Sequence, residues 1–179
     1  MMRECGVFVD QSSINRWAIR FWPLLEKVFR NHKRPVGDSR RMDETYIKVK
    51  GAWKYLYRAV NKKGQTIGFL LTAKRDKAAA LRFFDKAVQA SGVLGKVTMD
   101  KSGANKAAMD EINGRGETLI IVQQVKYLNN IVEQDNRAIK RVTRPMLNFK
   151  SFRSDKSVLA GVELMHMIRK GQRMIKGCI

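Results

Sequence analysis

Three consecutive segments of alternating apolar and polar residues constrain the fold of this chain most strongly. They cover residues 42–49, 53–60 and 66–72, and short turns at 50–51 and 61–64 separate them. Period-two alternation sends successive side chains to opposite faces of a sheet, and such short connections join neighbouring antiparallel strands. The sequence therefore predicts a three-stranded antiparallel meander.

Helical and strand patterns alternate after the meander. Apolar residues at helical spacing, such as Phe83, Phe84 and Ala87, predict helices, and short apolar runs between them predict strands. The expected segments are a helix over 76–90, a strand over 96–99, a helix over 104–113, a strand over 118–122 and a helix over 129–143 that Pro145 ends. The order β-β-β-α-β-α-β-α is that of a ribonuclease-H-like (integrase-type) catalytic core, an α/β fold with a mixed five-stranded sheet.

One amphipathic helix is expected near the N-terminus. Ile14, Trp17, Ala18 and Phe21 follow helical spacing within residues 10–21. The opposite, polar face carries Ser13, Asn15, Arg16 and Arg20. This face suits the second helix of a helix-turn-helix lying in a major groove of DNA. A small helix that packs on the next domain fits these residues equally well.

Three regions follow from these patterns. Residues 30–41 are rich in Arg and Lys around Pro35 and Gly37 and show no periodicity, which is typical of a basic linker. We therefore expect a partial helix-turn-helix DNA-binding segment over 1–29, the linker over 30–41, and a catalytic domain with a C-terminal helix over 42–179.

The net charge points to a polyanionic partner. The chain has 36 Lys and Arg against 16 Asp and Glu, a formal charge of +20, spread over a sequence that is 44% hydrophobic. Nucleic acid fits this charge better than a membrane, because no amphipathic anchor or membrane-spanning run accompanies it. Two cysteines, Cys5 and Cys178, form no metal or disulfide pattern, which favours a reducing, cytoplasmic location.

Three acidic residues are candidates for metal-dependent phosphodiester chemistry. Such chemistry uses two divalent ions about 3.5–4 Å apart, and magnesium prefers carboxylate oxygens. Asp43 lies in the first predicted strand, Asp100 directly follows the fourth, and Glu133 lies in the helix over 129–143. The first and fourth strands of this fold are neighbours and a later helix crosses beside them, so the three acids can meet.

Simpler roles compete with this interpretation. Asp100 could cap a turn or the following helix, and Glu133 could pair with Arg137 one turn later. Asp135 is a weaker alternative to Glu133, and strand parity sends Glu44 to the face opposite Asp43.

Basic residues follow Glu133 on the same predicted helix. Lys140 lies two helical turns after Glu133 and so on the same face, where it could bind a DNA phosphate. Arg137, Arg141 and Arg144 add positive charge around it. A solvated basic face is the ordinary meaning of such a run, but the overall charge favours DNA.

Seven stretches of this chain resemble insertion-sequence transposases of the DDE class, specifically the insertion sequence six family. They are KRPVG at 33–37, RMDETYIKVKG at 41–51, WKYLYRAV at 53–60, DKSGAN at 100–105, KYLNNIVEQD at 126–135, FKSF at 149–152 and GVELMHMIRKG at 161–171. The resemblance implies that Asp43, Asp100 and Glu133 bind two magnesium ions, with manganese as an alternative, and that Lys140 is the basic residue that follows the glutamate. It also implies cleavage and joining of double-stranded DNA, at the terminal inverted repeats and a target, by a homodimer or higher oligomer in the bacterial cytoplasm, at the nucleoid.

The chain departs from the family pattern in three places. Family members carry a further N-terminal segment with the first helix of the helix-turn-helix, whereas this chain begins at about the loop before the second. Arg40 stands where an aromatic residue is expected, and the 33 positions from Asp100 to Glu133 are fewer than usual, which indicates a trimmed loop near Gly114 and Gly116.

Two functions therefore remain open: an active transposase, and a truncated DNA-binding remnant that interferes with a full-length relative. The family stretches argue against a third function, that of another ribonuclease-H-like nuclease.

Overall fold

The computed structural model describes residues 6, 8–37, 39–91, 95–115, 119–125, 130–146 and 151–174. The chain forms two compact units. Met1–Lys33 and Lys150–Ile179 make up one, here called the helical unit, and Arg34–Phe149 make up the other, the sheet unit. Cys5, Gly116, Thr118 and Cys178 lie outside the described residues.

The sheet unit contains a mixed five-stranded sheet, as the sequence predicts. Its strands are β1 (Ser39–Val49), β2 (Ala52–Asn61), β3 (Thr66–Thr72), β4 (Lys96–Met99) and β5 (Ile121–Gln124). They lie in the order β3-β2-β1-β4-β5. The first three strands form the antiparallel meander, and β4 and β5 join it in parallel through helical crossovers. This arrangement confirms the expected α/β class.

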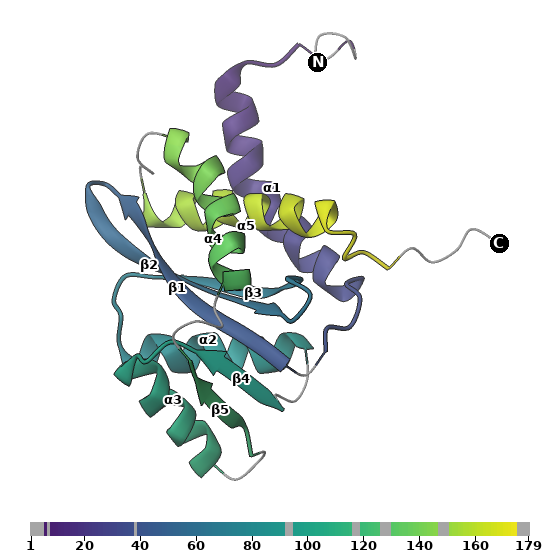
Figure 1. Cartoon of the computed structure of the whole chain (residues 1–179). Coiled ribbons are helices and arrows are strands. Elements are labelled where there is room, and N and C mark those ends of the chain that lie inside the picture. The colour runs from purple at the N-terminus through teal and green to yellow at the C-terminus, as the bar shows by residue number, and fades with distance from the viewer. Residues whose placement is uncertain are drawn as a thin grey trace, which may run out of the picture. The chain divides into compact units, whose positions relative to one another are not determined.

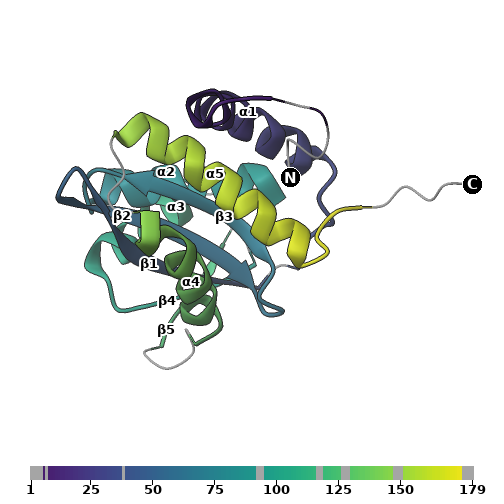
Figure 2. The same cartoon turned by 90° about the horizontal axis from the view of Figure 1, so that it is seen from above.

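Helices cover both faces of this sheet (Figures 1 and 2). They are α2 (Lys77–Ser91) and α3 (Gly103–Gly114) on one face and α4 (Asn130–Thr143) on the other. A short 3-10 turn, Arg144–Met146, follows α4, so Pro145 stands just beyond the helix that it was expected to end. The main hydrophobic core lies under α2, where the Tyr57 ring stacks on Phe83 with centroids 5.7 Å apart.

Buried side chains change face along β1 at Asp43 and Glu44. Before this point the buried positions are even-numbered and after it they are odd-numbered: Arg40 and Met42, then Thr45, Ile47 and Val49. The change follows from the helices, because Met42 belongs to the core under α2 whereas Ile47 lines one pocket with Lys140 and Thr143 of α4. Asp43 and Glu44 therefore stand where neither face is fully covered.

The basic linker predicted over 30–41 is shorter in the structure. The helix before it continues to Asn31 and β1 already begins at Ser39. Arg40, which stands where the family pattern has an aromatic residue, is 2% exposed. Its Nη1 donates a hydrogen bond of 2.9 Å to the backbone oxygen of Ala87 in α2. The sequence does not predict that Arg40 is buried, because composition does not distinguish a solvated guanidinium from one that donates a hydrogen bond to a carbonyl group.

The helical unit consists of α1 (Gln11–Asn31) and α5 (Phe152–Arg169). Asp10 caps α1 by accepting a hydrogen bond from the backbone N–H of Ser13, and the helix continues through Pro23. Phe29 of α1 and Leu164 and Met167 of α5 share one small core, against which Trp22 packs, so these two helices form one compact unit. The three sequence regions expected above, with the C-terminal helix in the catalytic domain, stay a prediction. Among the described residues, no helix combines the length and apolar character that crossing a membrane requires.

Gly161 of α5 packs closely against the Trp22 ring of α1. A Cβ atom at this position would lie 2.6–2.9 Å from ring carbons of Trp22, which is closer than side chains pack. Replacing a glycine inside a helix by alanine ordinarily stabilises the helix by about 1 kcal/mol. Here we expect Gly161→Ala to destabilise the protein, because the indole must move out of its place in the core.

The test is the urea midpoint of unfolding together with the tryptophan emission of the folded protein. Gly103→Ala is the matched control, because nothing lies within 4 Å of its new Cβ atom. A Gly161→Ala variant at least as stable as the parent protein would contradict the close packing.

Candidate active site

Asp43 and Asp100 lie side by side on neighbouring parallel strands. The last recorded partners of β1 and β4 are Arg41 and Thr98, and two further residues along each strand lead to Asp43 and Asp100. Asp43 is half-buried, and the side chain of Asp100 is 40% exposed. The register thus brings Asp43, within β1, beside Asp100, which directly follows the carboxyl end of β4.

Glu133 approaches Asp43 from the first turn of α4. Burial raises the pKa of the Asp43 carboxyl, and the negative charges of Asp100 and Glu133 raise it further, against a hydrogen bond from Asn136 that lowers it. Like charges shift a pKa in this way only at short range. The charges of both other predicted acids thus act on Asp43, although burial is the main cause of its raised pKa.

A buried ion pair holds α4 against the sheet. Arg58 of β2 is fully buried, directly opposite Asp43 in the strand register, and its Nη2 lies 2.7 Å from Oδ2 of Asp135. Its Nη1 donates a hydrogen bond of 3.0 Å to the side-chain oxygen of Asn136, and the Asn136 amide donates one of 2.7 Å to Asp43. One chain of polar contacts thus runs from the ion pair to the candidate catalytic carboxylate.

Three contacts of the structure bear on the competing roles. Asp135 was a weaker alternative to Glu133, and the structure places it against Arg58. The N-cap of α3 is Ser102 and not Asp100. Among the described residues no ion pair joins Glu133 to Arg137. The catalytic roles of the three acids stay a prediction.

Glu44 serves a second network on the other side of β1. It lies opposite Tyr57 of β2 and forms an ion pair with Arg75 from the loop before α2. Burial raises the pKa of the Glu44 carboxyl, and Arg75 counteracts this by stabilising its charge. The Arg75 guanidinium also lies 3.9 Å from Asp100, so it links this network to the candidate site.

The candidate acids do not form a closed ligand cage. No three Asp, Glu, His or Cys side chains in the described part of the chain are close enough together to hold a metal ion as they stand. Without a cation the three carboxylates repel one another. Glu133 is exposed to solvent, and the side chain of Asp100 is 40% exposed. What they offer is a set of hard oxygen donors around one half-buried carboxylate, the chemistry that divalent cations prefer.

The candidate DNA-binding residues lie on both units. Arg137, Arg141 and Arg144 are exposed on or just after α4, and Lys140 is partly buried among them. On α1, Asn15, Arg16 and Arg20 are exposed, and Arg16 donates a hydrogen bond of 3.1 Å to Ser13. The expected apolar face of α1 is also exposed, at Ile14, Trp17 and Phe21.

Sequence reasoning missed Arg58, Arg75 and Asn136. Arg58 left a usable signal, because it is a charged residue in a strand of buried neighbours and its hairpin partner is Asp43. Asn136 lies three positions after Glu133, one helical turn away. Arg75 lies in a polar loop, where no pattern distinguishes it from solvated residues.

Removing one partner of the Arg58–Asp135 pair should destabilise the protein strongly. Breaking a buried ion pair costs about 3–5 kcal/mol, because the remaining charge stays buried without compensation. We expect Arg58→Met and Asp135→Leu each to lower the free energy of unfolding by this amount. The double variant should recover at least half of the summed loss, since no charge is then left unpaired.

Urea denaturation of the four proteins gives the coupling energy directly. Arg115→Met is the control, because Arg115 forms surface ion pairs with Glu111 and Asp85 and is 49% exposed. Its effect should stay within about 1 kcal/mol. Equal losses for Arg58→Met and Arg115→Met would show that the buried pair does not hold α4.

Asp43→Asn should stabilise the protein when no cation is present. Since the pKa of Asp43 is raised on folding, the folded state binds a proton more tightly than the unfolded state. Stability therefore falls as the pH rises from the ordinary aspartate pKa through the raised value, and it stays lower above that window. The amide removes this loss and still accepts the hydrogen bond from Asn136.

The measurement is the thermal midpoint in EDTA-containing buffer at neutral and acidic pH. A gain of roughly 1 kcal/mol would appear as a rise of about 2–4 °C for a chain of this size. The difference from the parent protein should shrink toward acidic pH. A variant that is less stable than the parent at neutral pH would contradict the electrostatic strain at this position.

Known families and structures agree with this geometry. A family model described as a DDE domain matches residues 37–172. The transposase for insertion sequence-like element IS431mec of Staphylococcus aureus is 34% identical over 175 residues, which cover 97% of this chain and 76% of that protein. The transposase for insertion sequence element IS257 in transposon Tn4003, also from Staphylococcus aureus, is 34% identical over the same shares.

Solved structures show the same fold at low sequence identity. A chain of the simian T-cell lymphotropic virus intasome, solved with PP2A regulatory subunit B56 gamma, gives a TM-score of 0.57 at 14% identity and covers 82% of this chain and 54% of that one. The HTLV-2 integrase catalytic core domain in complex with magnesium (trimeric form) gives 0.54 at 16% identity, covering 70% and 85%. With the family model and the two staphylococcal relatives, the chain is identified as a DDE transposase of the insertion sequence six family.

Proposed function

We propose that this transposase cuts and joins the DNA ends of its insertion sequence with divalent cations held by Asp43, Asp100 and Glu133. The proposal is supported by the parallel register of β1 and β4, which brings Asp43 beside Asp100, and by the hydrogen bond from Asn136 of α4 to Asp43. In this proposal the acids of β1, of the end of β4 and of α4 come together around the cations. A cation between them would relieve their repulsion.

The donor set fits magnesium, with manganese as an alternative. Carboxylate oxygens are the ligands that hard divalent ions prefer, and no sulfur or imidazole ligand is needed. Two of the three carboxylates are accessible, which leaves room for water and for DNA phosphate oxygens. When bound, two such ions would activate the attacking oxygen and stabilise the leaving one.

The protein's own residues position these groups. Asp43 is fixed by the amide of Asn136, and the buried Arg58–Asp135 pair sets where α4 and therefore Glu133 stand. Lys140, two turns beyond Glu133, binds a phosphate of the DNA strand near the reacting bond. Cleavage by water and joining by a 3′-hydroxyl would use the same carboxylates in turn.

Double-stranded DNA is the proposed partner, both as terminal inverted repeats and as target. The formal charge of +20 supports a polyanion. Arg137, Arg141 and Arg144 would bind the DNA backbone around the site. The polar face of α1, which carries Ser13, Asn15, Arg16 and Arg20, would read a major groove. A homodimer or higher oligomer would bring two ends together in the bacterial cytoplasm, at the nucleoid.

Glu133→Gln should abolish chemistry while leaving DNA binding intact. The amide keeps the size of the side chain but removes the charge that a metal ion requires. Nicking and strand transfer of labelled terminal-repeat DNA in magnesium should fall at least about 100-fold, in line with the loss of a group that acts only in the transition state. Salt-dependent binding, measured by fluorescence anisotropy, should stay within two-fold of the parent.

Glu111→Gln is the matched control, because Glu111 is an accessible glutamate that pairs only with surface cations, Lys77 and Arg115. It should retain full activity. Unchanged product yield in Glu133→Gln would remove Glu133 from the site. Salt-sensitive binding with no products from the parent protein would instead indicate a DNA-binding remnant without catalysis.

A further inference from the structure

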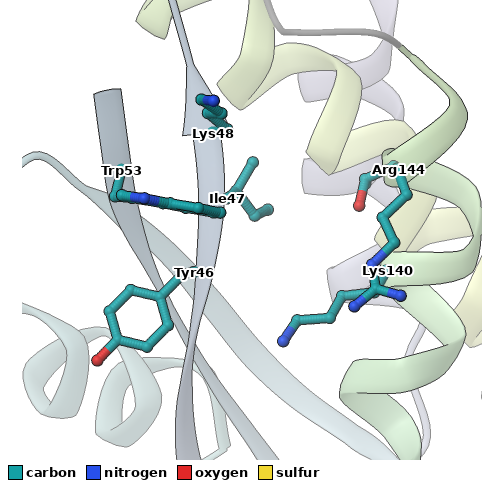
Figure 3. Close-up of a pocket in the computed structure, with 7 residues that line it drawn as sticks. Tyr46, Ile47, Lys48, Trp53, Lys140 and Arg144 are labelled. Atoms are coloured by element: carbon teal, nitrogen blue, oxygen red, sulfur yellow. The ribbon is translucent and has the colours of Figure 1, made fainter. Parts of the chain in front are cut away.

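A pocket of about 370 Å³ opens between the far end of the β1–β2 hairpin and the C-terminal half of α4 (Figure 3). It is lined by Tyr46, Ile47, Lys48, Trp53, Lys140, Thr143 and Arg144. This volume lies within the range of pockets that hold small ligands. The carboxylate site uses only Lys140 of these residues, so most of the pocket has no role yet.

The sheet leaves this end of β1 accessible. Recorded pairs between β1 and β4 end at Arg41, five positions before Tyr46. Beyond them β1 pairs with β2, up to the tight turn at Lys50 and Gly51, whose φ values of 47° and 79° suit a two-residue hairpin. Residues from both faces of β1 can therefore line one pocket beside α4.

The charge of the pocket selects an anion. Lys48, Lys140 and Arg144 contribute three cations, and none of the seven lining residues is acidic. In Figure 3 the Lys140 side chain extends from α4 toward the hairpin, the Arg144 side chain runs back along the helix toward Lys140, and Lys48 lies on β1 next to Ile47. Phosphate groups on the rim would meet positive charge from two elements.

The hairpin wall adds flat aromatic surface. Trp53 is 61% exposed and Tyr46 is 45% exposed, and their rings meet edge to face with centroids 6.4 Å apart. The Lys48 ammonium lies 5.9 Å from the Trp53 ring centroid. Exposed aromatic rings beside cations are how proteins bind single-stranded nucleic acid, because bases stack on the rings and phosphates bind the cations.

The pocket lies within a few nucleotides of the candidate acids. Lys140 follows Glu133 by seven residues, and a helix rises about 1.5 Å per residue, so about 10 Å separate their backbones along α4. Stacked DNA advances about 3.4 Å per nucleotide along one strand. A base in the pocket would thus belong to a nucleotide about three steps from the reacting phosphate.

We propose that this pocket holds one unstacked base of the DNA strand that is being cut or joined. Trp53 stacks on the base, Ile47 and Tyr46 complete the apolar wall, and the three cations bind the phosphates on either side. The base must leave the duplex stack to enter, so the pocket favours DNA that is frayed or single-stranded next to the cleavage point. The inference rests on the proposed function, since it places the same DNA strand at Lys140.

The test uses a DNA duplex with a five-nucleotide 3′ overhang in which one base is 2-aminopurine, a base whose fluorescence falls on stacking. Five versions place the probe at successive overhang positions, and a blunt duplex of the same sequence serves for comparison. We expect the parent protein to quench one or two adjacent positions. Trp53→Ala should lose this quenching and bind the overhang DNA about five-fold or more weakly, with blunt-duplex binding within two-fold of the parent.

Two variants control for loss of the fold and for general aromatic effects. Trp53→Phe retains a stacking ring and should keep most of the overhang affinity. Trp17→Ala removes a tryptophan of α1 that is 43% exposed, and it should leave the quenching unchanged. Circular dichroism and the thermal midpoint should show that Trp53→Ala is folded.

Several outcomes would overturn the inference. One is quenching that persists in Trp53→Ala. Another is an equal loss of affinity for blunt and overhang DNA, which would mean that the pocket binds duplex backbone. Glu133→Gln separates the two proposals: it should keep the quenching while losing products. Products retained in Glu133→Gln with quenching lost in Trp53→Ala would overturn the carboxylate site and leave the pocket standing.

Discussion

The buried contact between Arg58 and the Asp135–Asn136 pair is the interaction on which the candidate site depends. A guanidinium with no exposed surface cannot lose its partners without a large cost, so the position of α4 against β2 is fixed. Asn136 then transmits this position to Asp43, since its amide donates to that carboxylate. Glu133, one turn before Asn136, is exposed and has no comparable restraint of its own. Its place beside Asp43 follows from the helix that carries it.

The same region of β1 carries the electrostatic cost of the site. Two consecutive acids lie half-buried where the buried face of the strand changes. Asp43 faces α4, and Glu44 forms an ion pair with Arg75. Both have raised pKa values, mainly through burial. Glu44 has a protein cation as partner, whereas Asp43 has two further acids and one amide. This asymmetry separates Glu44, which has a protein cation as partner, from Asp43, the proposed metal ligand next to it in the sequence.

Local patterns predicted the elements of the sheet unit well. The meander, the strand over 96–99 and the helices on either side follow from period-two and helical spacing, which depend on neighbours in sequence. Asp43 and Asp100 could be placed at one sheet edge because parallel strands align their ends. The burial of Arg58 and Arg40 could not be predicted, because each is stabilised by a residue far along the chain. The partner is Asp135 for Arg58 and the Ala87 carbonyl for Arg40. The partner of α5 escaped for the same reason, because an apolar helix face does not specify what covers it.

These buried arginines change how the high positive charge should be understood. Arg40 and Arg58 add to the net charge of +20. Both side chains are buried and form hydrogen bonds inside the protein, so they are not available to bind DNA. The positive charge that can bind phosphates lies instead on exposed side chains. Along α4 and the turn after it, basic residues follow Glu133 as far as Arg144. Together with Trp53 and Lys48, which line the pocket, these side chains order the surface from the proposed metal-binding acids, through the proposed phosphate-binding Lys140, to an aromatic wall. A DNA strand that follows α4 would meet these groups in that order, which gives the strand a direction as well as a place.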